Sequence, residues 1–145
     1  MTPLKLVSDP NSANVATFIH GLRFAATPAE VQRETRTCLL DTLGVALAGT
    51  QLPIAGIVRR FVARHLAVGE GRGARMIRDG RRVSVPGAAM AGAAIIDGFD
   101  GHDGHALCKG HVGVTVVPTA LAFADALEVP STSGGVLGKI KEKLS

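Results

Sequence analysis

The residues best suited to chemistry lie in one short stretch, residues 97–111, which reads DGFDGHDGHALCKGH. The stretch holds three Asp, three His and one Lys, although the whole chain has only five His. Imidazole is a natural general acid or base near neutral pH, and a neighbouring carboxylate can orient it or share its proton. The pattern therefore predicts an acid–base site here. The plainer alternative is a solvated loop that joins two helices.

A metal site is the main chemical alternative for the same stretch. It offers five side chains of the kinds that bind zinc or another divalent ion, namely Asp100, His102, Asp103, His105 and His111. Their spacing matches no helical HExxH pattern, and Cys38 and Cys108 form no CxxC motif. The residues alone therefore leave open a divalent-metal-binding, hydrolase-like domain beside metal-free acid–base chemistry.

Two apolar segments flank the stretch and must position it. Residues 87–96 are rich in Ala and Gly and predict a helix that another helix can approach closely, and residues 116–127 predict a second helix. Upstream, apolar residues at helical spacing predict helices over residues 14–22, 27–48 and 53–68. Thr27 and Glu30 fit a capping box that starts the second of these, and Gly49 fits its end.

The segment between these helices predicts a β-hairpin. Residues 74–78 and 81–85 flank Asp79-Gly80, a dipeptide that suits a type I′ turn because both positions need positive φ. The chain is therefore expected to be all-α, a helical bundle with this one short β-hairpin. The candidate buried positions on the helix over residues 53–68 are Ile54, Ile57, Val58, Phe61 and Leu66.

Composition limits the function classes. Of the 145 residues, 46% are hydrophobic and 19% charged, which is too apolar for a disordered chain. The net charge of +4 comes from dispersed cations without interleaved aromatic residues, so nucleic-acid binding is not expected. The N-terminus has no apolar signal segment, and the nearly uncharged residues 112–124 are too few to cross a membrane. We expect a cytoplasmic protein without membrane contact, with a domain over residues 1–128 and a divergent Ser/Gly linker and basic tail over 129–145.

Three segments, in order, resemble the MmgE/PrpD family. Residues 38–49, CLLDTLGVALAG, resemble its signature near the N-terminus, and residues 86–94, PGAAMAGAA, resemble the segment after the hairpin. Residues 100–111, followed by VVPTALA at 116–122, are similar to the family's acidic, histidine-containing loop and the helix after it. The resemblance covers about residues 12–128 and concerns the N-terminal part of the family's chains.

This family includes 2-methylcitrate dehydratase, cis-aconitate decarboxylase and iminodisuccinate epimerase. The resemblance implies a largely helical domain, a homodimer, and lyase or isomerase chemistry on a small di- or tricarboxylate. It also implies metal-independent proton transfer next to a carboxylate, with no cofactor. The family's loop commonly has a Thr where Gly104 stands here and a Pro where Val112 stands. These departures, with the added His102, His105 and Lys109, favour the epimerase-like branch.

The resemblance also assigns roles to individual residues. Asp100 and His111 align best with the family's loop and are the expected catalytic residues. The expected substrate-binding residues, which hold substrate carboxylates or tune the acid–base pair, are Asp103, His105, Lys109 and His102.

The surroundings of this site carry three further expectations. Asp41 lies within an apolar helix and is expected to be a buried, hydrogen-bonded carboxylate rather than a catalyst. Because family members are much longer, the chain is expected to be an incomplete fragment without activity of its own, and a non-catalytic interaction module is the alternative. The helices over residues 87–96 and 114–126 are then expected to leave a large apolar patch exposed.

Overall fold

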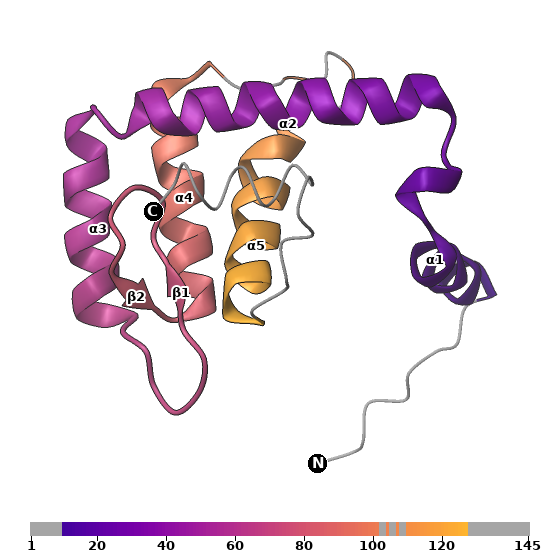
Figure 1. Ribbon diagram of the computed structural model, residues 1–145. Coiled ribbons are helices and arrows are strands. Elements are labelled where there is room, and N and C mark those ends of the chain that lie inside the picture. Colours follow the sequence, from indigo (N-terminus) through magenta and orange to yellow (C-terminus); the bar gives the residue numbers. More distant parts are fainter. Residues whose placement is uncertain (1–9, 102–103, 105–106, 108–109, 128–145) are drawn as a thin grey trace. The chain divides into compact units, whose positions relative to one another are not determined.

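The computed structural model describes residues 10–101, Gly104, Leu107 and residues 110–127 (Figure 1). Within these residues the chain forms α1 (Pro10–Gly21), the 3-10 helix η1 (Phe24–Ala26), α2 (Ala29–Gly49), α3 (Pro53–His65), α4 (Val85–Phe99) and α5 (Val112–Ala126). The strands β1 (Ala74–Arg75) and β2 (Arg82–Val83) form a two-stranded sheet. The prediction of an all-α fold with one short hairpin is confirmed. The residues up to Arg36 form one compact unit and those from Thr37 onward form a second.

The first unit contains α1, η1 and the start of α2. Its apolar side chains at helical spacing on α1, Phe18 among them, are exposed. The predicted capping box at Thr27 is wrong, because the Thr27 hydroxyl donates to the carbonyl of Phe24 (2.7 Å) and so closes η1. The Gln32 side chain donates to the Thr27 carbonyl (2.8 Å), and the Arg36 guanidinium lies 5.2 Å from the centre of the Phe24 ring.

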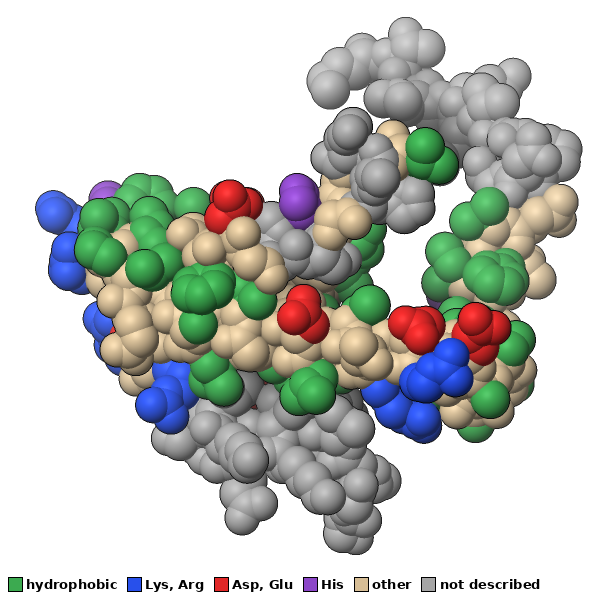
Figure 2. Space-filling model, turned by 90° about the horizontal axis from the view of Figure 1, so that it is seen from above, with side chains coloured by type: hydrophobic (Ala, Val, Ile, Leu, Met, Phe, Trp, Pro, Cys, Tyr) green, Lys and Arg blue, Asp and Glu red, His purple; other side chains and the backbone are tan. Residues whose placement is uncertain are grey.

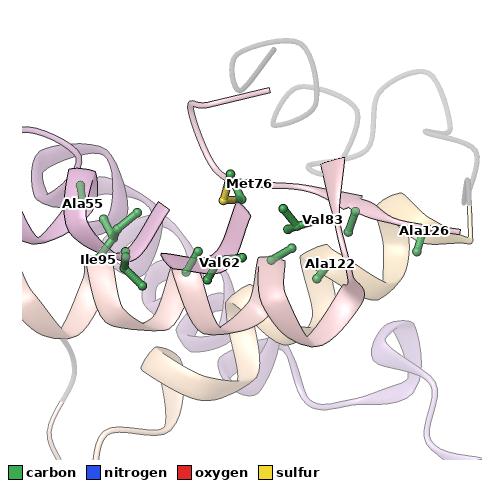
Figure 3. Packing of buried hydrophobic residues seen from close by; sticks show 11 residues of the cluster. Ala55, Val62, Met76, Val83, Ile95, Ala122 and Ala126 are labelled. Carbon is green, nitrogen blue, oxygen red and sulfur yellow. The ribbon is translucent and has the colours of Figure 1, made fainter. Parts of the chain in front are cut away.

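The second unit is built around α4. Helices α3 and α5 flank α4, and the hairpin contacts all three helices (Figure 1). Its main core is made of small and medium-sized aliphatic side chains (Figure 3), with Val62, Met76, Val83 and Ile95 the largest of those that are almost completely buried. In a chain without Trp or Tyr, helices must approach one another closely to bury such short side chains.

Glycines make these close approaches possible, as the Ala/Gly-rich sequence of α4 predicted. A Cβ atom at Gly92 would lie 2.7 Å from Cβ of Pro118 on α5, and one at Gly87 would lie 2.9 Å from Val62 on α3. At Gly98 an added Cβ would lie 2.7 Å from the side chain of Ile54. Three glycines spread along α4 therefore fix its position against both flanking helices.

The buried face of α3 differs from the prediction. Val58 is buried as expected, but Ile57 and Phe61 are exposed, and Ala55 and Val62 are buried instead. The reason is that α4 meets α3 through glycines, so the contact face carries the smaller side chains. Asp41 is a further correction: it is exposed on α2, not buried, because the face that α2 turns to the core carries Thr42, Val45 and Ala46.

The hairpin forms where it was predicted, but its turn is of another kind. Ala74 pairs with Val83 and Arg75 with Arg82 in an antiparallel register. Positive φ occurs at Arg78 (56°) and Gly80 (79°), not at Asp79, so the predicted type I′ turn at Asp79-Gly80 is wrong. The Asp79 N–H donates to the Met76 carbonyl (3.2 Å), and the Asp79 carboxylate is held by arginines.

None of the helices in the described residues is both long and apolar enough to cross a membrane alone. Together α2 and α3, bent by 90° at the break between them, meet that test by length and composition only.

Candidate functional site

The two residues expected to be catalytic lie at helix ends. Asp100 follows α4 as its C-cap, and His111 precedes α5 as its N-cap. Because α4 and α5 pack along each other, the same packing holds both ends in place (Figure 1). The side chains of Asp100 and His111 are both exposed, as a residue that meets a ligand from solvent must be. The placement of the pair at the ends of two adjacent helices agrees with the prediction for this loop.

Asp100 adopts an unusual backbone conformation. Its φ of 54° and ψ of 34° lie in the left-handed helical region, and its N–H donates to the Asp97 carbonyl (3.0 Å). Glycine is the residue most often found in this conformation just after a helix, since it has no Cβ to clash. Asp tolerates it better than most residues but still at some cost in stability. A carboxylate is therefore present where glycine would be the more stable choice.

The loop turns sharply directly after Asp100. A Cβ atom at Gly101 would lie 2.9 Å from the Phe99 ring and 3.7 Å from Val45 on α2. The backbone at Gly101 thus passes closely over Phe99 and beside α2, and no larger residue fits there without movement. Because Gly101 directly follows Asp100 and lies close to Val45, a shift of α2 would also displace Asp100.

Further along the loop, Gly104 lies beside the imidazole of His111. A Cβ atom added to Gly104 would be 3.3 Å from Cε1 and 3.6 Å from Nδ1 of His111. Gly104 therefore lies close to the histidine ring, although the two residues are seven positions apart in the sequence. A side chain at position 104 would crowd the His111 imidazole, and glycine avoids this.

The start of α5 adds an electrostatic feature to the site. The first N–H groups of a helix have no intrahelical acceptor and carry partial positive charge, so they favour a nearby anion. His111 itself makes no side-chain cap to these groups. A substrate carboxylate beside His111 would meet this positive end of α5, which suits chemistry next to a carboxylate.

The other predicted site residues, His102, Asp103, His105 and Lys109, lie outside the described residues, as does Cys108. Three members of the alternative metal-ligand set are therefore among them. In the part of the chain that is described, no group of three or more His, Cys, Asp or Glu side chains could hold a metal ion.

Sequence reasoning missed two charged clusters at the hairpin. Asp125 on α5 accepts hydrogen bonds from the side chain of Arg75 (2.6 Å) and from its backbone N–H (2.9 Å). Burial raises the pKa of Asp125, but the Arg75 hydrogen bonds outweigh burial and hold that pKa below its usual value. Hydrogen bonds from Arg81 likewise lower the pKa of Asp79. The signal was the density of arginine on both strands, which the sequence alone did not connect to Asp125.

Comparison with known proteins gives one match. A family model described as the MmgE/PrpD N-terminal domain matches residues 13–139. Neither the curated proteins nor the solved structures contain a match.

Proposed function

The chain belongs to the MmgE/PrpD family, and we propose that it contributes Asp100 and His111 to proton abstraction next to a carboxylate of a small di- or tricarboxylate. One observation carries the proposal: the two residues lie at the adjoining ends of α4 and α5, with the His111 ring close to Gly104. The boundary expected at residue 128 stays a prediction.

The proposed chemistry needs a base and a way to hold negative charge. When a base removes a proton from carbon next to a carboxylate, charge develops on the carboxylate oxygens. We assign the acceptance of that proton to His111 and Asp100, and the partial positive charge at the start of α5 would stabilise the developing negative charge. Lys109, outside the described residues, is proposed to bind a substrate carboxylate together with Asp103, His105 and His102 acting as partners or tuning groups.

Two acid–base groups are also what the isomerase form of the reaction needs. In an epimerisation one group removes the proton from one face of the carbon and the other returns a proton to the opposite face. Dehydration would instead need a group that protonates the departing hydroxyl, and decarboxylation would need loss of carbon dioxide followed by protonation of the resulting carbanion. His102, His105 and Lys109 depart from the usual pattern of the family's loop, and these departures support the epimerase-like branch.

We further propose that the protein is a cytoplasmic homodimer associated through its helical surfaces. Large apolar side chains are exposed within the second unit on α2 and α5, among them Leu40 (73% exposed), Val116 (56%) and Phe123 (53%). Figure 2 shows hydrophobic side chains spread over the face seen from above. Such exposed apolar area is typical of surfaces that other polypeptides cover.

Solvent deuterium exchange detects proton removal itself, whichever product the reaction then gives. The test uses a chimera in which residues 13–139 of this chain replace the corresponding segment of a full-length MmgE/PrpD enzyme. Iminodisuccinate, 2-methylcitrate and cis-aconitate are each incubated with the chimera in D2O and followed by NMR. One of them should exchange or convert, and His111→Ala should remove that activity while His65→Ala, an exposed histidine on α3, should retain it. Equal activity in both variants would refute the role of His111.

A further inference from the structure

The hairpin end of the second unit is unusually rich in arginine. Between residues 59 and 82 all cationic residues are arginine, eight in number, and only Glu70 and Asp79 are acidic. Arginine presents a planar fork of donors that matches phosphate and carboxylate oxygens, whereas lysine acts as a flexible point charge. In Figure 2, Lys and Arg side chains gather along the side on which α3 lies. This choice of cation indicates recognition of oxyanions.

Asp79 and Asp125 are each shared by two arginines. Asp79 accepts from Arg81 through Nε (2.5 Å) and Nη2 (2.8 Å), and its Oδ2 lies 3.9 Å from Nε of Arg59. On the other side of the hairpin, Arg75 and Arg82 are direct cross-strand partners, and both pair with Asp125. Like charges opposite each other destabilise a sheet. Asp125 offsets this repulsion, and two arginines against one carboxylate leave one positive charge on this side of the hairpin.

Arg59 lies beneath the turn, and one N–H donor of its guanidinium has no hydrogen-bond acceptor among the described residues. Its Nη2 donates to the Ile77 carbonyl (2.7 Å), while its buried Nε has no hydrogen-bond partner among the described residues. The Arg59 side chain is 14% exposed. A guanidinium held at this depth stays charged, so it adds a fixed positive charge below the surface of the turn.

Arg78 supplies an independent observation. It is exposed and has φ of 56°, a left-handed conformation in which glycine is the more stable residue. A residue held in a strained conformation points to a role for its side chain. With Arg59 and Arg81 it makes three arginines against the single Asp79, which leaves two positive charges at the turn.

From these observations we propose that the hairpin turn is a binding site for an anion bearing at least two phosphate groups, held by Arg78 and Arg81 above Arg59. Two positive charges match such an anion better than a singly charged one. Nucleic acid fits less well, because Phe61 is the only aromatic residue between residues 59 and 82 and stacking platforms are lacking. Ile77, next to Arg78, packs against Gly92 and against the core cluster that contains Ile96 and Val114, so the turn lies beside the C-terminal half of α4.

Titration of inorganic pyrophosphate into the full chain at low ionic strength, measured by calorimetry, tests the proposal. Wild type should bind pyrophosphate, and Arg78→Gly should weaken binding by at least about tenfold, the loss expected for one charge-assisted contact. Because glycine suits the φ of Arg78, this variant should unfold at the same temperature as wild type or higher, which separates loss of binding from loss of fold.

Arg33→Gln is the matched control, since it removes the same charge from an exposed arginine outside the hairpin and should change binding by less than about twofold. The proposal is overturned if wild type does not bind pyrophosphate, or if both variants weaken binding equally. It is also overturned if citrate competes as strongly as pyrophosphate, or if a single-stranded oligonucleotide binds more tightly and loses affinity equally in both variants.

Discussion

Two glycines of α2, five residues apart, should respond to the same substitution with opposite signs. Gly44 is exposed, and a Cβ atom there would meet nothing within 4 Å. Gly44→Ala should therefore raise the free energy of unfolding by about 0.5–1 kcal/mol through helix propensity alone. Gly49 is buried at the end of α2, where an added Cβ would contact the backbone carbonyl of Ile95 and lie 2.9 Å from its Cγ2.

The cost at Gly49 depends on the atoms that the new methyl group would contact. A side chain can rotate away, but the carbonyl of Ile95 is fixed within α4, so α2 and α4 must separate. Overpacking of this kind costs about 1–3 kcal/mol, and we expect the upper half of that range for Gly49→Ala. Since Ile95 lies about one and a half turns before Asp100, the displacement should also move the Asp100 carboxylate.

Urea unfolding monitored by helical circular dichroism measures both variants on one scale. The midpoints should move in opposite directions, with a difference in free energy of about 3 kcal/mol between Gly44→Ala and Gly49→Ala. If Gly49→Ala unfolds at the same urea concentration as wild type, the close approach of α2 to α4 at Ile95 is refuted.

Three further outcomes are expected. The pKa values of Asp79 and Asp125 are lowered by folding, so their stabilisation is complete above the unfolded value of about 3.9 and is lost as the pH falls through the lower folded values. In wild type the urea midpoint of unfolding should fall as the pH drops below about 4, and in Asp125→Asn it should fall less steeply. The same dependence on pH in both proteins would argue against the pairing of Asp125 with Arg75. Purified protein should contain no stoichiometric zinc and keep its melting temperature with a chelator, whereas an equivalent of zinc lost in Asp100→Ala would favour the metal site. Sedimentation should show self-association that Phe123→Glu weakens, and a monomer that binds no apolar dye would contradict the proposed use of the exposed helix faces.

Local signals predicted the elements well. Helical spacing located α1 to α5 to within a few residues, Gly49 ended α2 and Pro53 began α3 as expected. The start of α5 was set four residues too late, at 116 instead of Val112, because the Gly-rich loop before it hid the beginning of the helix. Helical spacing and helix-terminating residues depend only on neighbours in the sequence, so they can be recognised before the fold is known.

Faces and turns were predicted less well because they depend on partners distant in sequence. Ile57 and Phe61 fit a buried stripe on α3 by spacing alone, but glycines on α4 select the smaller Ala55 and Val62 as the contact face. Asp79 fits a type I′ turn locally, yet Arg59 on α3 and Arg81 hold its carboxylate and place positive φ at Arg78 instead.

The site was only partly open to prediction for the same reason. The acidic and basic side chains of residues 97–111 were recognisable by type, and the helix-end positions of Asp100 and His111 agreed with the flanking apolar segments. The proximity of Gly104 to the His111 ring could not be predicted, because it depends on tertiary structure. The left-handed conformation of Asp100 was also unforeseen, since glycine is the usual residue at such a position.

That conformation supports the proposed role of Asp100. A strained residue persists only where surrounding packing determines its position, and α4 meets that condition because Gly87, Gly92 and Gly98 fix it against α3 and α5. A rigid α4 delivers its last residue to a defined point beside the start of α5, whatever that residue is. Glycine adopts the left-handed backbone at position 100 at less cost, and a catalytic use of the carboxylate would explain the presence of Asp there.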